Sequence, residues 1–386
     1  MGRTHQGRSR RIAVATILWP LLLLVSGCSS VWPETSDQPV ETLDHPTVEE
    51  RAAELDPPPD AGFRFVVFGD QRAMADGEWQ SMIKTIAADF ADDDRMLFVM
   101  DTGDCVDDGR FSDQWHMLKG ILEPISDWPY LVAVGNHEVH DNVYPQAIQN
   151  TVKFLARLDE DFGPNRMYYR KDVGPVTFIV LDTNVLAYGP DGRARFVEQP
   201  EPGSYAQQQF DWFQEQLEDV PPDRTLVVAM HHPFVQSSRK HMATARGLWN
   251  VKIAGRRLPD VLADAGVDLV VVGHTHTYER FRLERDDGRM LHVVNVSGRP
   301  RDSFLWFGAS ERRVQDITGH EQRFFLTRGF ENLDRWKIEQ VEAMLDTETN
   351  QYALVDVEPD GSLRLQVYFL TDGDEMVVHH PPVVLE

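Results

Sequence analysis

Cysteine is nearly absent from this sequence, with two residues in 386. This shortage excludes a disulfide-stabilised scaffold and a structural zinc site made of four cysteines. Basic residues are also outnumbered, because 38 Lys and Arg stand against 62 Asp and Glu and leave a formal net charge of −24. Such a charge repels a phosphate backbone, so the sequence predicts no general nucleic-acid binding.

Long hydrophobic runs are lacking as well. The apolar stretch Ile12–Val25 contains Pro20 and is shorter than the roughly 20 residues that a membrane-spanning helix needs. Several arginines precede it, which is typical of a secretory signal peptide. A hydrophobic content of 42% and an aromatic content of 10% exclude a disordered chain and are sufficient for a large core.

The apolar stretch ends at Val25-Ser26-Gly27-Cys28, which resembles the lipobox of bacterial lipoproteins. We therefore expect a signal peptide over residues 1–27, a lipidated Cys28, and a disordered acidic and proline-rich tether over residues 28–61. The protein would then be exported and held by its lipid at the extracytoplasmic face of a bacterial envelope membrane. The alternative is a plain signal peptide with an incidental cysteine, and the export route stays open. The folded body is expected over residues 62–386.

Five short apolar runs predict buried strands. They are Phe63–Phe68, Met96–Met100, Tyr130–Val134, Thr225–Met230 and Leu269–Val272. Helical patterns lie between several of them, so the sequence predicts an α/β fold. In open α/β sheets, ligands bind beyond the carboxyl ends of the strands, which makes the residues just after each run the candidates for a site.

Each of these strands is followed by side chains that can bind metal. The segments are Gly69-Asp70, Gly103-Asp104, Gly135-Asn136-His137-Glu138, His231-His232-Pro233 and Gly273-His274-Thr275-His276. A single Asp after a strand is more often a helix cap or a turn residue, but five cases in one chain are hard to attribute to caps. The mixture of carboxylate, amide and imidazole favours Fe, Mn or Zn. The donors are too many for one tetrahedral ion, so a two-metal site bridged by a carboxylate is predicted.

In this order, the five segments resemble the calcineurin-like metallophosphoesterase superfamily. The string from Gly273 to Arg280 is most similar to the purple acid phosphatase branch. The resemblance implies a four-layer α-β-β-α sandwich of two mixed sheets. It also implies metal ligands, which are Asp70, Asp104 and His276 for the first ion and Asp104, Asn136, His231 and His274 for the second. Asp104 would bridge the two ions.

The resemblance further implies residues that act on the substrate. His137 would contact the phosphate and assist protonation of the leaving group, so His137 and Asp104 are the expected catalytic residues. From the residues themselves, Arg72 and His232 are further candidates for phosphate contact. For His232, a place on a solvated surface loop is the other interpretation. For Arg72, pairing with a carboxylate such as Asp76 is an equally good interpretation.

Two positions depart from the family pattern. The superfamily usually has His two residues after the first Asp, where this chain has Arg72. Purple acid phosphatases have Tyr three residues after the bridging Asp, where this chain has Asp107. The first metal is thus left with three obvious ligands, and the violet iron–phenolate colour is not expected.

The expected activity is metal-dependent hydrolysis of small phosphorylated substrates, chiefly phosphomonoesters, by a hydroxide that two metal ions activate. Two alternatives stay open, namely a phosphodiesterase or nucleotidase with the same site, and a degenerate surface lipoprotein without turnover. The aromatic-rich insertion over residues 299–344 would be either a lid or a packed subdomain. The oligomeric state is left open, and the N-terminal lipid is the one membrane contact expected.

Overall fold

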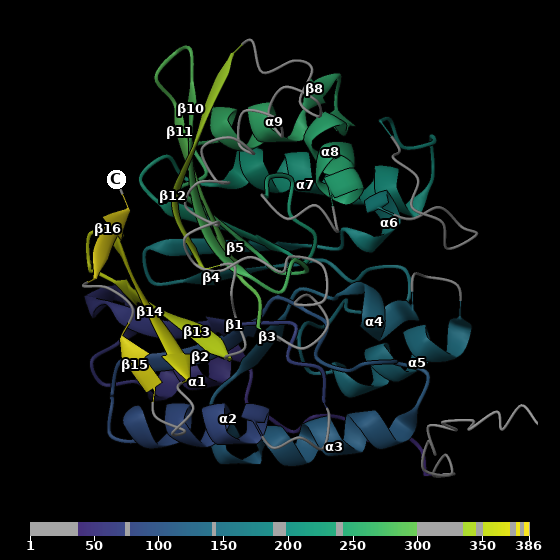
Figure 1. The fold of residues 1–386 in the computed structure, drawn as a ribbon, viewed down its shortest axis with the longest axis vertical. Helices are drawn as coiled ribbons and strands as arrows, with labels where there is room; N and C mark the ends of the chain where they lie inside the picture. The colour runs from purple at the N-terminus through teal and green to yellow at the C-terminus, as the bar shows by residue number, and fades with distance from the viewer. Residues whose placement is uncertain are drawn as a thin grey trace, which may run out of the picture. The chain divides into compact units, whose positions relative to one another are not determined.

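The structure is a computed structural model that describes residues 38–73, 78–140, 144–187, 198–236, 242–298, 335–344, 350–370, 376–378 and 382–385 (Figure 1). The expected signal peptide, Cys28, Asp76 and residues 299–334 of the insertion lie outside the described residues. All described residues belong to the unit that begins at Ser36. None of their helices is long and apolar enough to cross a membrane.

Two large sheets and one small ribbon hold the strands. The strands are β1 (Phe63–Phe68), β2 (Met96–Asp101), β3 (Tyr130–Val132), β4 (Tyr169–Val173), β5 (Val176–Leu181), β6 (Thr225–Met230), β7 (Lys252–Ile253), β8 (Arg256–Arg257), β9 (Leu269–Val272), β10 (Tyr278–Arg285), β11 (Met290–Val296), β12 (Trp336–Met344), β13 (Gln351–Val357), β14 (Leu363–Leu370), β15 (Met376–Val378) and β16 (Val383–Leu385). The five expected strands are all present, and β1, β6 and β9 have the expected bounds.

The helices connect these strands. They are α1 (Val48–Glu54), α2 (Glu78–Asp89), α3 (Ser112–Leu122), α4 (Asn136–Val139), α5 (Pro145–Phe154), α6 (Asn184–Ala187), α7 (Tyr205–Asp219), α8 (Met242–Asn250) and α9 (Leu258–Asp264). Two single 3-10 turns, Pro59–Ala61 and Glu123–Ile125, complete the set.

Both large sheets are mixed. The first has the order β15-β14-β13-β1-β2-β3, and β16 also pairs with β14. The second has the order β12-β10-β11-β9-β6-β5-β4. Strands β1, β2 and β3 run parallel to one another, as do β5, β6, β9 and β11. The carboxyl ends of each parallel set therefore meet at one edge of their sheet.

The sheets pack face to face between two helical layers. Phe178 on β5 lies edge-on against Phe65 and Phe98 of the first sheet, with ring centroids 5.3 and 5.2 Å away. Figure 1 shows α2 and α3 on the outer face of the first sheet and α7, α8 and α9 on the outer face of the second. A second apolar cluster fills the space between the second sheet and its helices. The predicted four-layer α-β-β-α sandwich is confirmed.

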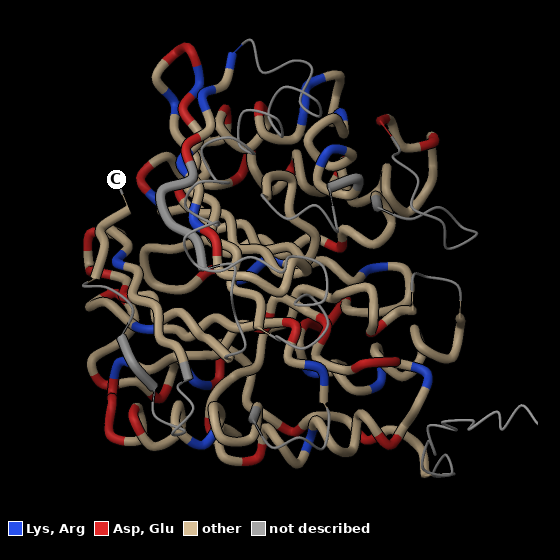
Figure 2. Tube along the Cα trace, viewed as in Figure 1, with Lys and Arg blue, Asp and Glu red and all other residues tan. Residues whose placement is uncertain are grey.

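The central strands of the two large sheets carry few charges. Figure 2 shows that most strand positions in the middle of the fold are neither acidic nor basic, and that charged residues lie mainly on outer helices and turns. The central strands β2, β5 and β9 are buried along their whole length. Strands buried on both faces read as continuous apolar runs, which is why the sequence revealed β2 and β9.

Residues 38–61 differ from the expected tether. Val40, Leu43, Val48 and Leu55 are buried in the main core. Helix α1 begins with a capping box, in which Glu50 N donates to Thr47 Oγ1 and Thr47 N donates to the Glu50 carboxylate. The prolines and acids suggested a solvated tether, but apolar residues spaced between them bury enough surface to fix the segment.

The described end of the insertion is packed against the second sheet and its helices. Trp336–Met344 forms β12, which pairs with β10 at the edge of the second sheet. Trp336 is buried against Trp249, with ring centroids 6.1 Å apart. This part of the insertion extends the sheet, so a lid could include only the preceding residues.

Candidate metal centre

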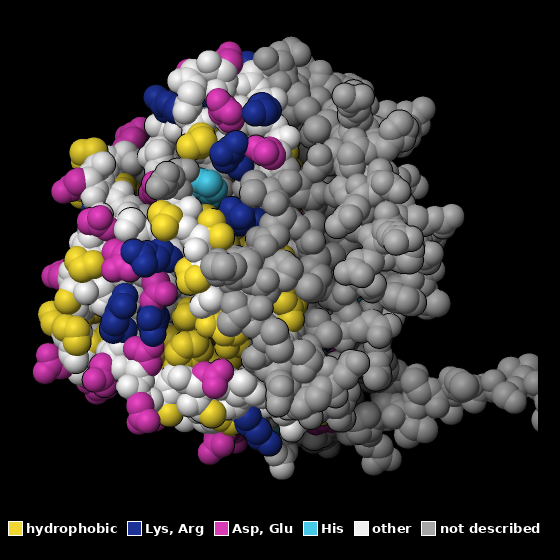
Figure 3. Space-filling view, turned by 60° about the vertical axis from the view of Figure 1, so that its left-hand side comes forward, with side chains coloured by type: hydrophobic (Ala, Val, Ile, Leu, Met, Phe, Trp, Pro, Cys, Tyr) yellow, Lys and Arg dark blue, Asp and Glu magenta, His cyan; other side chains and the backbone are white. Residues whose placement is uncertain are grey.

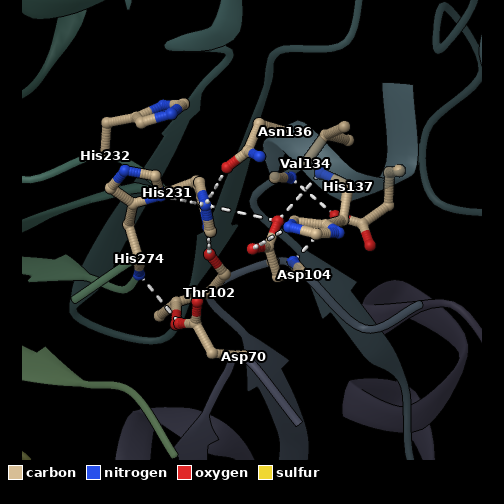
Figure 4. Close-up of polar contacts among 12 residues, drawn as sticks. Asp70, Thr102, Asp104, Val134, Asn136, His137, His231, His232 and His274 are labelled. Carbon is tan, nitrogen blue, oxygen red and sulfur yellow. Dashed lines mark hydrogen bonds and ion pairs between the residues drawn. The ribbon is translucent and has the colours of Figure 1, made fainter. Parts of the chain in front are cut away.

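The candidate residues from both sheets meet at the carboxyl ends of the parallel strands. Asp70, Asp104 and Asn136 follow β1, β2 and β3 in the first sheet. His231 follows β6, and His274 follows β9, both in the second sheet. Figure 4 shows these side chains pointing toward one another across the junction of the two sheets. The site therefore exists only because the two sheets face each other.

The backbone is strained at these positions. Asp70, Arg72, Asp104, His274 and His276 all have positive φ, between 45° and 72°. Non-glycine residues adopt this left-handed conformation uncommonly, and such strain clusters at active sites and ligand clamps. Five such residues in three short turns indicate that these turns are shaped for a function.

Two glycines permit the close approach of these turns. A Cβ on Gly135 would lie 2.4 Å from Asp104 N. A Cβ on Gly273 would lie 2.6 Å from Thr102 Oγ1 and 2.8 Å from Asp70 Oδ2. Neither position has room for a side chain, which explains why glycine precedes Asn136 and His274.

Four atoms that could bind a metal ion lie close together, and Nε2 of His231 is one of them. Its Nδ1 lies 2.8 Å from the carbonyl oxygen of Thr102 and donates to it, which leaves Nε2 to face the site (Figure 4). Three atoms lie close to this Nε2, namely His274 Nδ1 at 3.1 Å, Asn136 Oδ1 at 3.2 Å and Asp104 Oδ1 at 3.4 Å. Atoms that one ion binds at about 2.1 Å lie about 3.0–3.4 Å apart. The three distances to His231 Nε2 match this spacing, so the four atoms are candidate ligands of one metal ion.

Asp104 is held in its ionised form. Burial raises the pKa of its carboxyl. The neighbouring His137, His231 and Arg72 lower that pKa by a larger amount, so it lies well below its ordinary value. The backbone N–H of His137 also donates to Oδ1 over 3.0 Å. A buried carboxylate that stays ionised is suited to hold a cation.

Asp70 and His276 form a second donor group with Asp104. One donor atom from each of the three lies within 4.8 Å of the others. Asp70 Oδ2 accepts from His274 N at 2.8 Å and from Ser297 Oγ at 2.6 Å. Asp70 Oδ1 is buried, accepts no hydrogen bond among the described residues, and lies 3.5 Å from His276 Nε2. Burial, and then the charge of Asp104, raise the pKa of Asp70.

Arg72 enters this second group. Its Nη2 lies 3.4 Å from His276 Nε2 and 3.7 Å from Asp104 Oδ2, while its Nη1 lies 3.2 Å from Asp107 Oδ1. Among the described residues, the carboxylates that lie beside Arg72 are therefore those of Asp107 and Asp104. The group fits a second divalent ion poorly, because it offers three donors and a guanidinium already contacts two of them.

His137 is partly exposed, with 26% of its side chain accessible. Its Nδ1 donates to the carbonyl oxygen of Asp107, since a carbonyl can only accept. Its Nε2 faces Asp104 Oδ2 at 3.7 Å. The imidazole is thus oriented with one nitrogen anchored and the other directed to the site.

His232 lies behind this cluster. It is fully buried, its ring packs on His274 at 4.4 Å between centroids, and its Nδ1 lies 2.8 Å from Thr183 Oγ1. It could offer a donor atom together with His231 and His274. Its expected contact with phosphate stays a prediction.

Three supporting residues were missed by the sequence reasoning. Ser297 ties Asp70 to the turn of His276, whose N–H donates to Ser297 Oγ at 2.7 Å. Glu138 accepts from Asp104 N, Gly135 N and Val106 N. Thr102 orients His231. Ser297 directly follows β11, but a lone serine after a strand does not by itself indicate a site.

A profile of the calcineurin-like phosphoesterase family matches residues 63–278. This range includes every metal-donor residue described above and more than half of the chain. The chain belongs to the calcineurin-like phosphoesterase family.

Purple acid phosphatases are among the relatives of this chain. Purple acid phosphatase 21 of Arabidopsis thaliana is 27% identical over 44% of this chain and 35% of its own length. Probable purple acid phosphatase 20 from the same plant is 26% identical over 58% of this chain and 48% of its own length. Human acid phosphatase type 7 is 26% identical over 45% of this chain and 37% of its own length. This chain thus spans less than half the length of these relatives.

Solved structures share the fold. A purple acid phosphatase from yellow lupin (Lupinus luteus) seeds superposes with a TM-score of 0.51 at 16% identity, over 82% of this chain and 53% of that one. PhoD superposes with a TM-score of 0.53 at 12% identity, over 84% of this chain and 68% of that one. At such identities the likeness concerns the fold alone.

Proposed function

We propose that this phosphoesterase hydrolyses small phosphorylated substrates, chiefly phosphomonoesters, in a metal-dependent reaction. The observation that carries the proposal is the convergence of Asp104, Asn136 and His274 on His231 Nε2 at 3.1–3.4 Å. The acid phosphatases among the relatives support a monoester substrate. Of the two ions that the sequence predicts, one is proposed here, at this group of four donors.

The protein's part in the reaction is to hold and aim the charges. A divalent ion at the four donors would attract phosphoryl oxygens and make water a competent nucleophile at neutral pH. Asp104 would hold the ion with a buried carboxylate that is ionised across the physiological pH range. The hydrogen bond from His231 Nδ1 to Thr102 fixes the tautomer that presents Nε2 to the ion.

His137 is proposed as the general acid. Its Nδ1–H is engaged by the Asp107 carbonyl, so a second proton would reside on Nε2, the atom that faces the site. As water forms a new bond to phosphorus and the bond to the leaving group breaks, transfer of that proton to the leaving oxygen would let the group leave as an alcohol. The partial exposure of His137 allows it to regain a proton from solvent.

The ester class is testable on the purified protein. We expect nitrophenyl phosphate to be hydrolysed faster than bis-nitrophenyl phosphate when Mn²⁺, Zn²⁺ or Fe²⁺ is supplied. Because nitrophenolate can leave without a proton, the general acid is tested on an alkyl phosphate, for which we expect His137→Gln to lower kcat about 100-fold with little change in bound metal. A faster diester reaction would favour the phosphodiesterase alternative. No hydrolysis of either ester by folded, metal-loaded protein would favour the non-catalytic lipoprotein and refute the proposal.

We also propose that the chain is exported and anchored through a lipid on Cys28, on the sequence evidence of residues 25–28. The test is the mass of the mature N-terminus and its partition into detergent. A Cys28→Ser chain recovered in the aqueous phase supports the anchor, whereas unmodified Cys28 in the mature protein refutes it.

A further inference from the structure

We infer that the guanidinium of Arg72 takes the place of the first metal ion, so that the site holds one metal ion and one fixed organic cation. The inference deepens the proposed function, and rests on it only in requiring that the four donors around His231 bind a metal ion. It concerns the group of Asp70, Asp104 and His276, into which Arg72 projects.

Arg72 and a first metal ion would both need the lone pair on His276 Nε2. A guanidinium has only donors, so in its 3.4 Å contact with Arg72 Nη2 the Nε2 of His276 must accept. This Nε2 is the atom that lies 3.5 Å from Asp70 Oδ1 and would bind an ion in the group. Because the same lone pair cannot serve a proton donor and a metal ion at once, Arg72 and a first metal compete for it.

Arg72 is also held in place. Its side chain is 11% exposed, and Nη1 pairs with Asp107 Oδ1 at 3.2 Å while Nη2 lies 3.7 Å from Asp104 Oδ2. Its backbone N–H donates to the carbonyl oxygen of Asp104 over 3.0 Å, in the left-handed conformation with φ 45°. The guanidinium therefore sits between two carboxylates, as a cation bound there would.

This ion pair also explains the two departures in the sequence. Arg72 and Asp107 stand where the family pattern led us to expect a His or a Tyr ligand, and here the two side chains bind each other. The group thus keeps three donors and gains an internal positive charge. With Arg72 in this position, a second divalent ion lacks a full ligand set, because the guanidinium contacts His276 Nε2 and lies near Asp104 Oδ2.

Metal content tests the inference directly. The full chain is saturated with Mn²⁺, freed of excess ion by gel filtration, and its manganese is measured by mass spectrometry. We expect one ion per chain in the wild type and two in Arg72→His, which exchanges the cation for an imidazole donor. The paramagnetic resonance spectrum should show an isolated Mn²⁺ in the wild type and an exchange-coupled pair in the variant.

Arg110→His is the matched control, because Arg110 pairs with Asp108 outside the donor groups. It should keep one ion. Two ions in the wild type, with a coupled spectrum, would overturn the inference, and that measurement needs no variant. A folded Arg72→His that still binds one ion would also overturn it. No bound metal in any chain would instead count against the proposed function, so the two failures are distinguishable.

Discussion

At the residue scale, the site depends on buried polar side chains that hold its turns in place and are not themselves candidate metal ligands. Glu138 is fully buried, and its carboxylate accepts three backbone N–H groups, including those of Asp104 and Gly135 at 2.8 and 2.7 Å. Burial, and then the charge of Asp104, raise its pKa. One side chain therefore joins the turn after β2 to the turn after β3.

Glu138→Gln tests this connection. The amide would direct an NH₂ group at backbone donors, leaving at least one buried donor unsatisfied. We expect a loss of about 2 kcal/mol in the free energy of unfolding and a roughly tenfold weaker metal affinity. Denaturant titration and metal competition measure the two effects. Glu54→Gln on the exposed side of α1 is the control, and equal behaviour of both variants would refute the role of Glu138.

Asp182, which directly follows β5, should make the free energy of unfolding depend on pH. Burial raises its pKa to about 6, although hydrogen bonds from Asn184 oppose this. Because the folded-state pKa lies above the unfolded one, its contribution to stability is full at low pH and is lost as pH rises toward 6. Asp182→Asn should therefore gain about 2 kcal/mol relative to the wild type between pH 4.5 and pH 7.5.

Denaturant unfolding at the two pH values, with metal held constant, measures this change. Asp223→Asn, an exposed aspartate, serves as the control and should follow the wild type. A constant difference between Asp182→Asn and the wild type at both pH values would show that Asp182 does not titrate as stated.

At the element scale, the buried strands were easier to predict from the sequence than the contacts between residues of the two sheets. Buried strands appear in the sequence as uninterrupted apolar runs, so β1, β6 and β9 could be delimited, and the donors after them could be identified from sequence. The partners of Arg72 could not be identified, because Asp107 and His276 belong to different sheets and only the packing of the sheets brings them together. Ser297 was missed because a lone serine after a strand carries little chemical signal.

Gly273→Ala tests the close packing of the strand ends. The added Cβ would approach Thr102 Oγ1 and Asp70 Oδ2 to 2.6 and 2.8 Å, so the turn that carries His274 must shift. We expect metal affinity to fall at least about tenfold. Gly120→Ala is the matched control, because Gly120 is exposed on α3 with nothing within 4 Å of the added Cβ. It should raise stability by about 0.5 kcal/mol. Unchanged metal affinity in Gly273→Ala would contradict the packing.

At the scale of the whole molecule, the acidic excess does not oppose a phosphate substrate. Figure 3 shows Lys and Arg side chains lying beside Asp and Glu on one face. Elsewhere in the fold, the buried Arg285 pairs with Asp264 and Asp287. The two donor groups concentrate buried carboxylates that bound cations would neutralise. The attraction for phosphate is thus local, and the net charge of −24 describes the chain rather than the site.

The segment before β1 is part of the folded unit. Besides its buried apolar residues, His45 Nδ1 lies 2.8 Å from the carbonyl oxygen of Trp128, and Glu49 pairs with the buried Lys171 at 3.0 Å. We expect a chain shortened to begin at Gly62 to melt at least about 5 °C below one beginning at Ser36. Calorimetry measures the difference, and equal melting temperatures would restore the tether interpretation.

The central claim is that phosphoester hydrolysis depends on a metal ion held at Asp104. Its most direct test is to add Mn²⁺ stepwise to metal-depleted protein while following nitrophenol release from nitrophenyl phosphate in the same sample. The account predicts that the rate rises with added metal and levels off near one ion per chain, and that Asp104→Asn stays at the blank rate. Hydrolysis that is independent of added metal, or an Asp104→Asn rate equal to that of the wild type, would contradict it.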